Sequence, residues 1–258
     1  MRTSKAVDGY FEEEELMKLP ILFCLITLRL TAQVGEFNKP WEDTTKAIII
    51  DAYSENKIDW VALQTDKRVV AVIHKASQGE KADPGYSTRK AITKQQGLLF
   101  GSYHLATPGD PIRQADCYLE MTGGDTTELL ALDLESLDST KHMTLPNAEK
   151  FIKRVVEVTG RYPIVYCNRV LLNEISTRYD STSVFAKCGL WYARMRPDIP
   201  DYNATLWPAY SLWQFSCEIN CRTTGTCLYN VPGTAYDMDV NVYNGTIDEL
   251  RNRWPSLK

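Results

Sequence analysis

The sequence predicts an α/β fold, a distorted (β/α)8 TIM-like barrel that is irregular in its last third. From residue 47 onward, apolar runs of strand length alternate with segments of helical periodicity, the pattern of a parallel sheet covered by helices. Eight such runs fit into about 210 residues, the size of one barrel domain. The expected strands are Ala47–Asp51, Val69–Lys75, Leu98–His104, Leu129–Glu135, Pro163–Cys167, Leu190–Arg194, Tyr210–Phe215 and Ala235–Val242.

Helix signals separate most of these strands. Ser87 is a suitable N-cap and Gly97 a suitable stop for the segment between them, and Gly160 ends a later helix. The expected helices cover 58–63, 87–96, 111–121, 145–159, 169–178 and 246–254. No clear helix separates the sixth and seventh strands, which is the source of the expected distortion. An open doubly wound sheet is the alternative, but no Gly-rich phosphate-binding motif follows any strand.

The N-terminal region differs from the rest. Four acids, Glu12–Glu15, precede Met17 and the apolar stretch Pro20–Leu30. Read from Met17 to about Ala32, a basic start, a short apolar core and small residues are typical of a secretory signal. We expect an acidic leader and signal at 1–32, a linker at 33–46 and a single barrel domain at 47–258. A buried strand or helix behind an acidic leader is the alternative.

Composition narrows the possible functions. The 258 residues carry a net charge of −4, which argues against a general nucleic-acid binder. No apolar run reaches the ~18 residues that a membrane span needs. Three histidines leave little room for a zinc site built on imidazoles.

Seven cysteines favour an oxidising compartment. If Cys24 leaves with a signal, six remain, an even number. Cys217, Cys221 and Cys227 crowd into a loop-like stretch, so we expect at least one disulfide among them. A zinc site is the alternative, although no histidine lies nearby.

Polar side chains stand at the C-terminal ends of all eight expected strands. Barrel active sites are built at that rim. In chain order the rim offers Asp51, Lys75, Tyr103 with His104, Asp133 with Glu135, Tyr166 with Asn168, Tyr192 with Arg194, Gln214, and Asp239 with Asn241.

Asp133 and Glu135 form the sharpest pair. Residues i and i+2 of a strand share a face, and two neighbouring carboxylates repel, so one keeps its proton near neutral pH. A protonated acid beside a carboxylate is what glycosidic cleavage needs. The alternative without a function is that the two acids are the solvent-exposed end of the strand. A metal site of four acids is another, against which Lys75 argues. A Ser or Cys nucleophile with His74 or His104 lacks the G-x-S-x-G elbow.

Seven motifs in order resemble glycoside hydrolase family 25, the lysozymes or muramidases of the Chalaropsis type. The resemblance runs from about Ile48 to Tyr243. It rests on Ile50–Ser54, Lys57–Trp60, Ile73–Gly79, Gly101–Leu105 followed by Gln114-Ala115, Leu132–Glu135, Trp213–Ser216 and Asp239–Tyr243. The chain departs from the family in a short segment between Ser54 and Ile58, in Ser77-Gln78, and in the insertion from Cys217 to Cys227 beside the site.

The resemblance implies a catalytic barrel that hydrolyses the β-1,4 bond between N-acetylmuramic acid and N-acetylglucosamine in bacterial peptidoglycan. It makes Glu135 the general acid, with Asp133 assisting and Asp51 and Asp239 supporting the site. Lys75, Tyr103, Tyr166 and Gln214 would bind the sugars. We expect no cofactor and no metal, with peptidoglycan glycan strands as the partner. The signal-like segment and the cysteines predict a secreted protein, which we expect to be a monomer.

Two alternatives stay open. One is a glycosidase on a related amino-sugar polymer, chitin or deacetylated peptidoglycan. The other is a non-catalytic wall-binding protein, against which the intact set of carboxylates argues.

Overall fold

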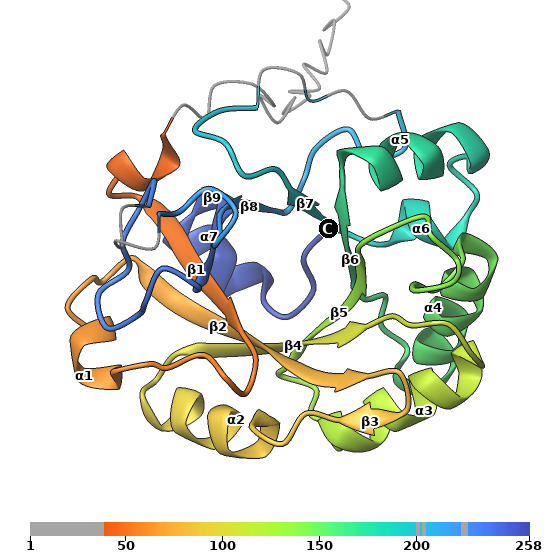
Figure 1. Ribbon diagram of the computed structural model, residues 1–258, viewed down its shortest axis with the longest axis horizontal. Coiled ribbons are helices and arrows are strands. Elements are labelled where there is room, and N and C mark those ends of the chain that lie inside the picture. The colour runs from red at the N-terminus through yellow and green to blue at the C-terminus, as the bar shows by residue number, and fades with distance from the viewer. Residues whose placement is uncertain (1–38, 200–201, 203–204, 223–226) are drawn as a thin grey trace, which may run out of the picture. The chain divides into compact units, whose positions relative to one another are not determined.

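The expected barrel is confirmed. The computed structural model describes residues 39–199, 202, 205–222 and 227–258, so the expected leader and signal lie outside the described residues. Within these described ranges, nine strands form one sheet in the order β1-β9-β8-β7-β6-β5-β4-β2-β3, and a further β1–β2 pairing closes eight of them into a barrel. The helices α2, α3, α4 and α5 lie outside the strands (Figure 1).

The strands are β1 (Lys46–Ala52), β2 (Val69–Gln78), β3 (Lys81–Ala82), β4 (Leu99–Leu105), β5 (Leu129–Leu134), β6 (Ile164–Asn168), β7 (Leu190–Ala193), β8 (Leu212–Ser216) and β9 (Asp239–Thr246). The helices are α1 (Trp60–Leu63), α2 (Tyr86–Gln95), α3 (Pro111–Thr122), α4 (Leu145–Thr159), α5 (Arg169–Arg178), α6 (Val184–Lys187) and α7 (Ile247–Arg253), with a 3-10 turn η1 (Pro40–Glu42).

The distortion of the barrel lies in its last strand. β9 runs antiparallel to both β8 and β1, whereas the other barrel strands pair in parallel. The pattern of alternating strands and helices predicted a parallel last strand, with Asp239 near its end. Instead Asp239 begins β9 and pairs with Asp51 of β1. Because an antiparallel strand enters the barrel where parallel strands leave it, Asp239 still reaches the expected rim.

The strands are apolar throughout because both of their faces are buried. Ile48 and Ile50 of β1 face the helices, while Ala47 and Ile49 fill the barrel interior. The same alternation places Leu130 and Leu132 of β5 outside and Leu129 and Ala131 inside. The two layers form separate apolar clusters, one under the helices and one inside the barrel.

Helix starts follow ordinary capping chemistry. The Asp59 and Asp110 side chains accept backbone N–H groups at the starts of α1 and α3, and Asn168 does so for α5. Thr246 and Glu249 form a capping box on α7. Gly160 ends α4 at φ 68°, a left-handed conformation that glycine adopts readily.

Part of the segment expected as a linker packs on the barrel. The Trp41 ring stacks on Phe215 of β8 at 4.8 Å between centroids, and the Arg68 guanidinium donates to the Trp41 carbonyl. The short elements η1, β3 and α6 have no counterpart among the expected ones. Their few residues carry too little periodicity for a pattern to reveal them.

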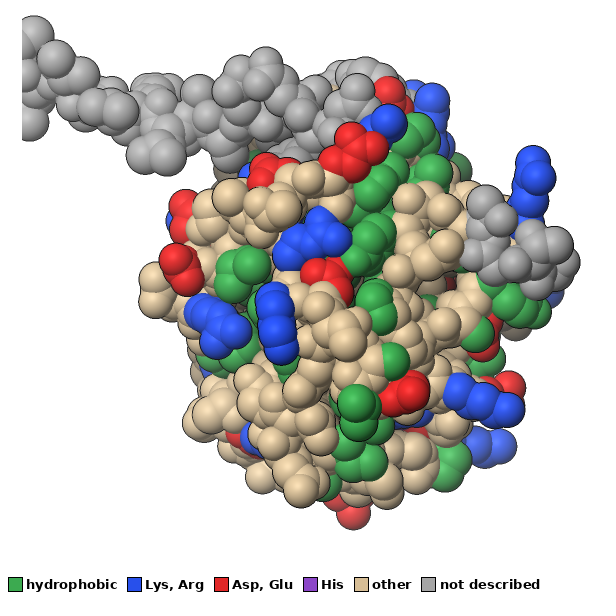
Figure 2. Space-filling view, turned by 90° about the vertical axis from the view of Figure 1, so that its left-hand side faces the viewer, with side chains coloured by type: hydrophobic (Ala, Val, Ile, Leu, Met, Phe, Trp, Pro, Cys, Tyr) green, Lys and Arg blue, Asp and Glu red, His purple; other side chains and the backbone are tan. Residues whose placement is uncertain are grey.

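The surface in Figure 2 mixes basic, acidic and hydrophobic side chains, and neither sign of charge dominates that face. Among the residues that the structure describes, no helix is long and apolar enough to cross a membrane.

Candidate active site

A small pit opens at the carboxyl ends of the parallel strands. Its volume is about 60 Å³. Four acids and three aromatic residues line it: Asp51, Tyr103, Asp133, Glu135, Tyr166, Trp191 and Asp239. We call this the acidic pit. The structure therefore brings together six of the eight residues that the sequence predicts for the site.

The acidic pit continues the inward-facing rows of the strands. Asp51 follows Ile49 at i+2 on β1, and Asp133 follows Ala131 on β5. Side chains two apart on a strand share a face, so each polar residue lies directly above the apolar interior of the barrel. The interior cluster thus forms the floor, and the polar residues of the last inward positions form the pit.

A hydrogen-bond network fixes Asp51. Its Oδ2 accepts from Asn241 Nδ2 at 2.6 Å and from Gln214 Nε2 at 3.2 Å. Trp191 Nε1 donates to Asn241 Oδ1 at 2.6 Å, and the Tyr166 hydroxyl donates to Gln214 Oε1 at 2.7 Å. These bonds set the orientation of both amides. Gln214 therefore lies beneath the pit, holding Asp51 and Tyr166.

Asp51 and Asp239 form a coupled acid pair. Burial raises the pKa of Asp51 to about 6, against the hydrogen bonds from Asn241, Gln214 and Asp239 that lower it. The pKa of Asp239 is raised well above its usual range, first by burial and then by the charge of Asp51. Two carboxyls in one low-dielectric site cannot both ionise easily, so the pair holds a proton near neutral pH.

Asp133 is buried in the pit, and one of its carboxylate oxygens has no partner among the described residues. Only 8% of its surface is exposed, and its buried Oδ1 has no hydrogen-bond partner in the structure. Its pKa is raised well above the usual range by burial, then by the charges of Glu135 and Asp51, while Lys75 opposes the shift. A polar group held this way is ready for a ligand that can complete its hydrogen bonds.

Glu135 differs from its partner Asp133. It follows the end of β5, and its side chain is 50% exposed. The Asn168 side chain donates to the Glu135 carbonyl at 2.8 Å, which fixes the backbone while the carboxylate reaches the pit opening. The sequence predicts that one carboxyl of this pair keeps its proton. In the structure Asp133 is the buried member of the pair, and burial raises its pKa.

Three aromatic rings form a wall of the acidic pit. Trp191 meets Tyr166 edge to face at 5.1 Å and Tyr103 at 6.4 Å between centroids. The sequence pointed to Tyr192 instead of Trp191 at this strand end. Tyr192 faces outward and packs against Tyr202. Both residues of β7 are aromatic, so only the register of the strand decides which one enters the site.

Lys75 lies beside the pit, in a neighbouring groove. Its ammonium is 3.7 Å from Asp83 Oδ2 and 4.7 Å from the centroid of the Tyr53 ring. The groove measures about 740 Å³ and extends along the β2–β3 hairpin. Lys75 is thus placed to meet a substrate that extends out of the acidic pit.

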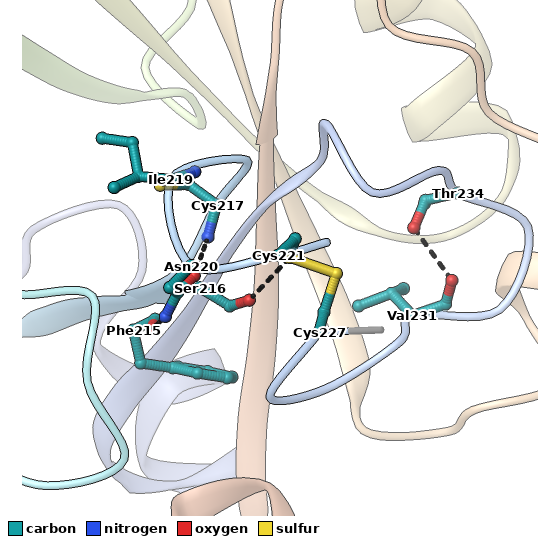
Figure 3. The surroundings of a disulfide bond; sticks show 9 residues. All are labelled: Phe215, Ser216, Cys217, Ile219, Asn220, Cys221, Cys227, Val231 and Thr234. Atoms are coloured by element: carbon teal, nitrogen blue, oxygen red, sulfur yellow. Dashed lines mark hydrogen bonds between the residues drawn. A yellow bond between two sulfur atoms is a disulfide. The ribbon is translucent and has the colours of Figure 1, made fainter. Parts of the chain in front are cut away.

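The expected disulfide is confirmed. Cys221 bonds to Cys227, so the loop between β8 and β9 is covalently closed (Figure 3). Asn220 holds the start of the loop by accepting from Cys217 N and donating to the Phe215 carbonyl, both at 2.9 Å. Cys217 is a free, buried thiol. The loop follows β8, which carries Gln214, and ends at Asp239, the first residue of β9.

A buried Ser–His contact lies away from the site. Ser77 Oγ is 2.9 Å from His104 Nδ1, and His104 Nε2 is 3.1 Å from Gln114 Oε1. All three side chains are buried, and the His104 ring stacks on Phe151 of α4. Burial lowers the pKa of His104 to about 4. The contact holds β2, β4 and α3 together and offers no accessible nucleophile.

The fold and the acidic pit define a glycoside hydrolase of the barrel class. Residues 50–223 match the family described as glycosyl hydrolases family 25. The chain belongs to this family, and it is an enzyme of the lysozyme and muramidase type.

Relatives and solved structures agree with this assignment. The chain is 28% identical over 197 residues to the N,O-diacetylmuramidase of Chalaropsis sp, which covers 70% of this chain and 85% of the relative. Its fold is similar to the bacterial lysozyme from Streptomyces coelicolor, with a TM-score of 0.66, 22% identity and coverage of 83% and 99% of the two chains. It is also similar to the muramidase from Trichobolus zukalii, with a TM-score of 0.62, 23% identity and coverage of 81% and 99%.

Proposed function

We propose that this enzyme hydrolyses the β-1,4 bond between N-acetylmuramic acid and N-acetylglucosamine in bacterial peptidoglycan. The observation that carries the proposal is the acidic pit, where Asp133 and Glu135 differ in burial within one site. Two carboxyls in unlike environments can take unlike roles in glycosidic cleavage. The Chalaropsis relative, whose printed name is N,O-diacetylmuramidase, supports the substrate class.

Glu135 acts as the general acid. Its carboxyl stands at the opening of the pit, where a glycosidic oxygen can approach it. A bound sugar covers this half-exposed group and removes its water, and desolvation favours the protonated form. Substrate binding thus favours the protonated form of Glu135 that the cleavage step needs. Proton donation to the leaving oxygen then lets the C–O bond break.

Asp133 assists the reaction from the floor of the site. Its unpartnered Oδ1 can accept a hydrogen bond from the acetamido N–H of the sugar. Positive charge that develops on the sugar ring favours the ionised form of a nearby carboxyl. Asp133 therefore stabilises the transition state more strongly than the ground state. Asp51 and Asp239 tune this pair through their charge, and Tyr103, Tyr166 and Lys75 bind the sugars.

We further propose a secreted, monomeric enzyme. The Cys221–Cys227 disulfide supports an oxidising compartment. The proposed signal from Met17 to about Ala32 lies outside the described residues. Intact-mass analysis of the native secreted form tests this, because a mature chain that begins near Gln33 is expected.

Digestion of purified peptidoglycan tests the proposed reaction. Mass analysis after borohydride reduction is expected to show muropeptides whose reducing end is muramic acid, with or without a metal chelator. Fragments from chitin or deacetylated wall alone would support a related glycosidase instead. Binding without any fragments would overturn the enzymatic proposal.

A further inference from the structure

A histidine on the loop after β5 faces the proposed general acid. His142 Nδ1 lies 4.0 Å from Glu135 Oε2. This nitrogen is buried and has no hydrogen-bond partner in the structure, and the side chain as a whole is largely buried. A buried nitrogen beside a carboxylate, with no other partner, is placed for a proton exchange with that carboxylate.

The position of His142 is set by its loop. His142 N and Lys141 N donate to the Asp138 carbonyl at 2.9 and 3.0 Å, and Thr140 donates to the Asp138 carboxylate. Met143 is buried directly after it. On the other side, Asn168 fixes the Glu135 backbone. Both ends of the contact are therefore anchored, and only the half-exposed Glu135 carboxylate needs to rotate to close it.

We propose that His142 stores the proton that Glu135 delivers, an inference that rests on the proposed role of Glu135 as general acid. In this proposal the two facing groups of the free enzyme share one proton, which rests on the imidazole of His142. An imidazole titrates in the neutral range, well above a typical carboxyl. The pair therefore keeps its proton at a higher pH than a lone glutamate would.

Substrate binding moves this proton. A sugar over the pit excludes water, and an ion pair loses stability relative to the neutral pair when its solvent is removed. The Nδ1–H bond of His142 breaks and an O–H bond forms on Glu135, which leaves a neutral imidazole and a neutral carboxyl. Glu135 then gives the proton to the leaving glycosidic oxygen, which also takes the electron pair of the broken C–O bond.

Other charged groups face this pair from several elements. Asp133 on β5 and Tyr166 on β6 face Glu135. Asp138, on the same loop, lies within electrostatic range of His142, and Lys141 pairs with Asp138 at 3.8 Å. Lys141 is a permanent positive charge next to His142 in sequence, and its side chain is mostly exposed. It therefore supplies a matched control.

The test is the pH profile of kcat/KM on peptidoglycan for wild type, His142→Asn and Lys141→Gln. Asparagine places a donor close to the position of Nδ1 but cannot take up a proton. We expect the basic limb of His142→Asn to move to lower pH by about one to two units, because the pair's proton is then held by a lone glutamate and no longer by an imidazole. Lys141→Gln is expected to keep the wild-type profile, because its charge faces Asp138 and solvent.

A second measurement does not depend on activity. The titration midpoint of the His142 imidazole, followed by NMR, is expected to fall by about one pH unit in Glu135→Gln, because the facing negative charge is lost. Identical pH profiles for wild type and a folded His142→Asn would overturn the proton store. A wild type that leaves peptidoglycan intact would refute the proposed function instead, and the NMR titration would still decide whether the two groups are coupled.

Discussion

The two ends of the barrel treat acidic residues in opposite ways. At the carboxyl end, Asp51, Asp133 and Asp239 form no ion pair with any of the described residues, and the pKa of each is raised. At the amino end, Glu128, Asp125 and Asp66 are paired with lysine or arginine. The same residue types therefore form the proposed catalytic site at one end and stabilise the fold at the other.

The amino end shows what a satisfied acid looks like. Glu128, fully buried before β5, accepts from the Tyr86 hydroxyl at 2.7 Å and from the Lys90 ammonium at 2.5 Å. Asp125 pairs with Lys90 at 3.1 Å and also with Lys94. These lysines and the Thr127 donors lower the pKa of Asp125 despite its partial burial. Asp66 beside Arg68 likewise has a lowered pKa.

This difference between the two ends shows where buried acids lower the stability of the fold. Burying a carboxylate without a cation destabilises the folded state. Among the residues that the structure describes, the acids buried in this way are those of the acidic pit. Substitutions at the two ends should therefore affect different properties of the enzyme. Those at the pit should remove activity and leave stability intact or improved, and those at the amino end should do the reverse.

The largest expected effect is that of Glu135→Gln. The amide has nearly the same shape but no proton to donate, so kcat should fall by about 10²–10⁴-fold. The urea midpoint should stay near that of wild type, because Glu135 is half exposed and its anchor is its backbone carbonyl. Release of reducing ends from peptidoglycan measures the first effect. More than about a tenth of wild-type activity would remove Glu135 from its proposed role.

The fold was predictable from sequence because both faces of each barrel strand are buried. Such strands appear as continuous apolar runs, as Ala47–Ile50 and Leu129–Leu132 do. The direction of β9 was not predictable. Its local pattern fits either direction, and the structure shows that it runs antiparallel to β8.

The sequence predicts the residues of the acidic pit that stand at strand ends, but it does not predict those that depend on strand register or on a loop. Asp51 and Asp133 stand out because charge interrupts an apolar run. Trp191 does not, since its neighbour Tyr192 is also aromatic and register alone separates them. His142 lies in a polar loop seven positions after Glu135, where no periodicity marks it. Such contacts depend on loop geometry, about which the sequence pattern contains little information.

The next effect, Glu128→Gln, tests the amino end. The variant removes a fully buried charge and leaves Lys90 with Asp125 as its remaining acid. Breaking a buried ion pair on one side typically costs about 3 kcal/mol or more of unfolding free energy. Urea unfolding measures this loss. Peptidoglycan turnover at 25 °C should match wild type, because Glu128 lies before β5 and the acidic pit lies beyond its other end. A Glu128→Gln protein as stable as wild type would show that pairing at this end contributes little to the fold.

The last variant, Asp51→Asn, is expected to change stability in the opposite direction. The folded-state pKa of Asp51 is about 6, above the value of 3.8 for an unperturbed aspartate. A raised folded-state pKa means that the unfolded chain gives up this proton first as pH rises. Asp51 therefore costs nothing below about pH 4, and its cost grows between pH 4 and 6. At pH 7 it reaches about 3 kcal/mol, the free energy of roughly two pKa units.

An asparagine can take the place of Asp51 in the network. Asn241 and Gln214 both donate to the same oxygen, Oδ2, so an amide oxygen there can accept both bonds, and the amide N–H₂ then faces Asp239. We therefore expect Asp51→Asn to unfold at higher urea than wild type at pH 7 and at the same urea at pH 4. Activity should fall and the pH–rate profile should shift, because Asp133 and Asp239 lose a neighbouring negative charge that raises their pKa. A gain in stability that is equal at both pH values would mean that the charge of Asp51 is not its source. Equal unfolding curves at pH 7 would mean that the pit imposes no cost on the fold, and the contrast between the two ends of the barrel would then be one of geometry alone.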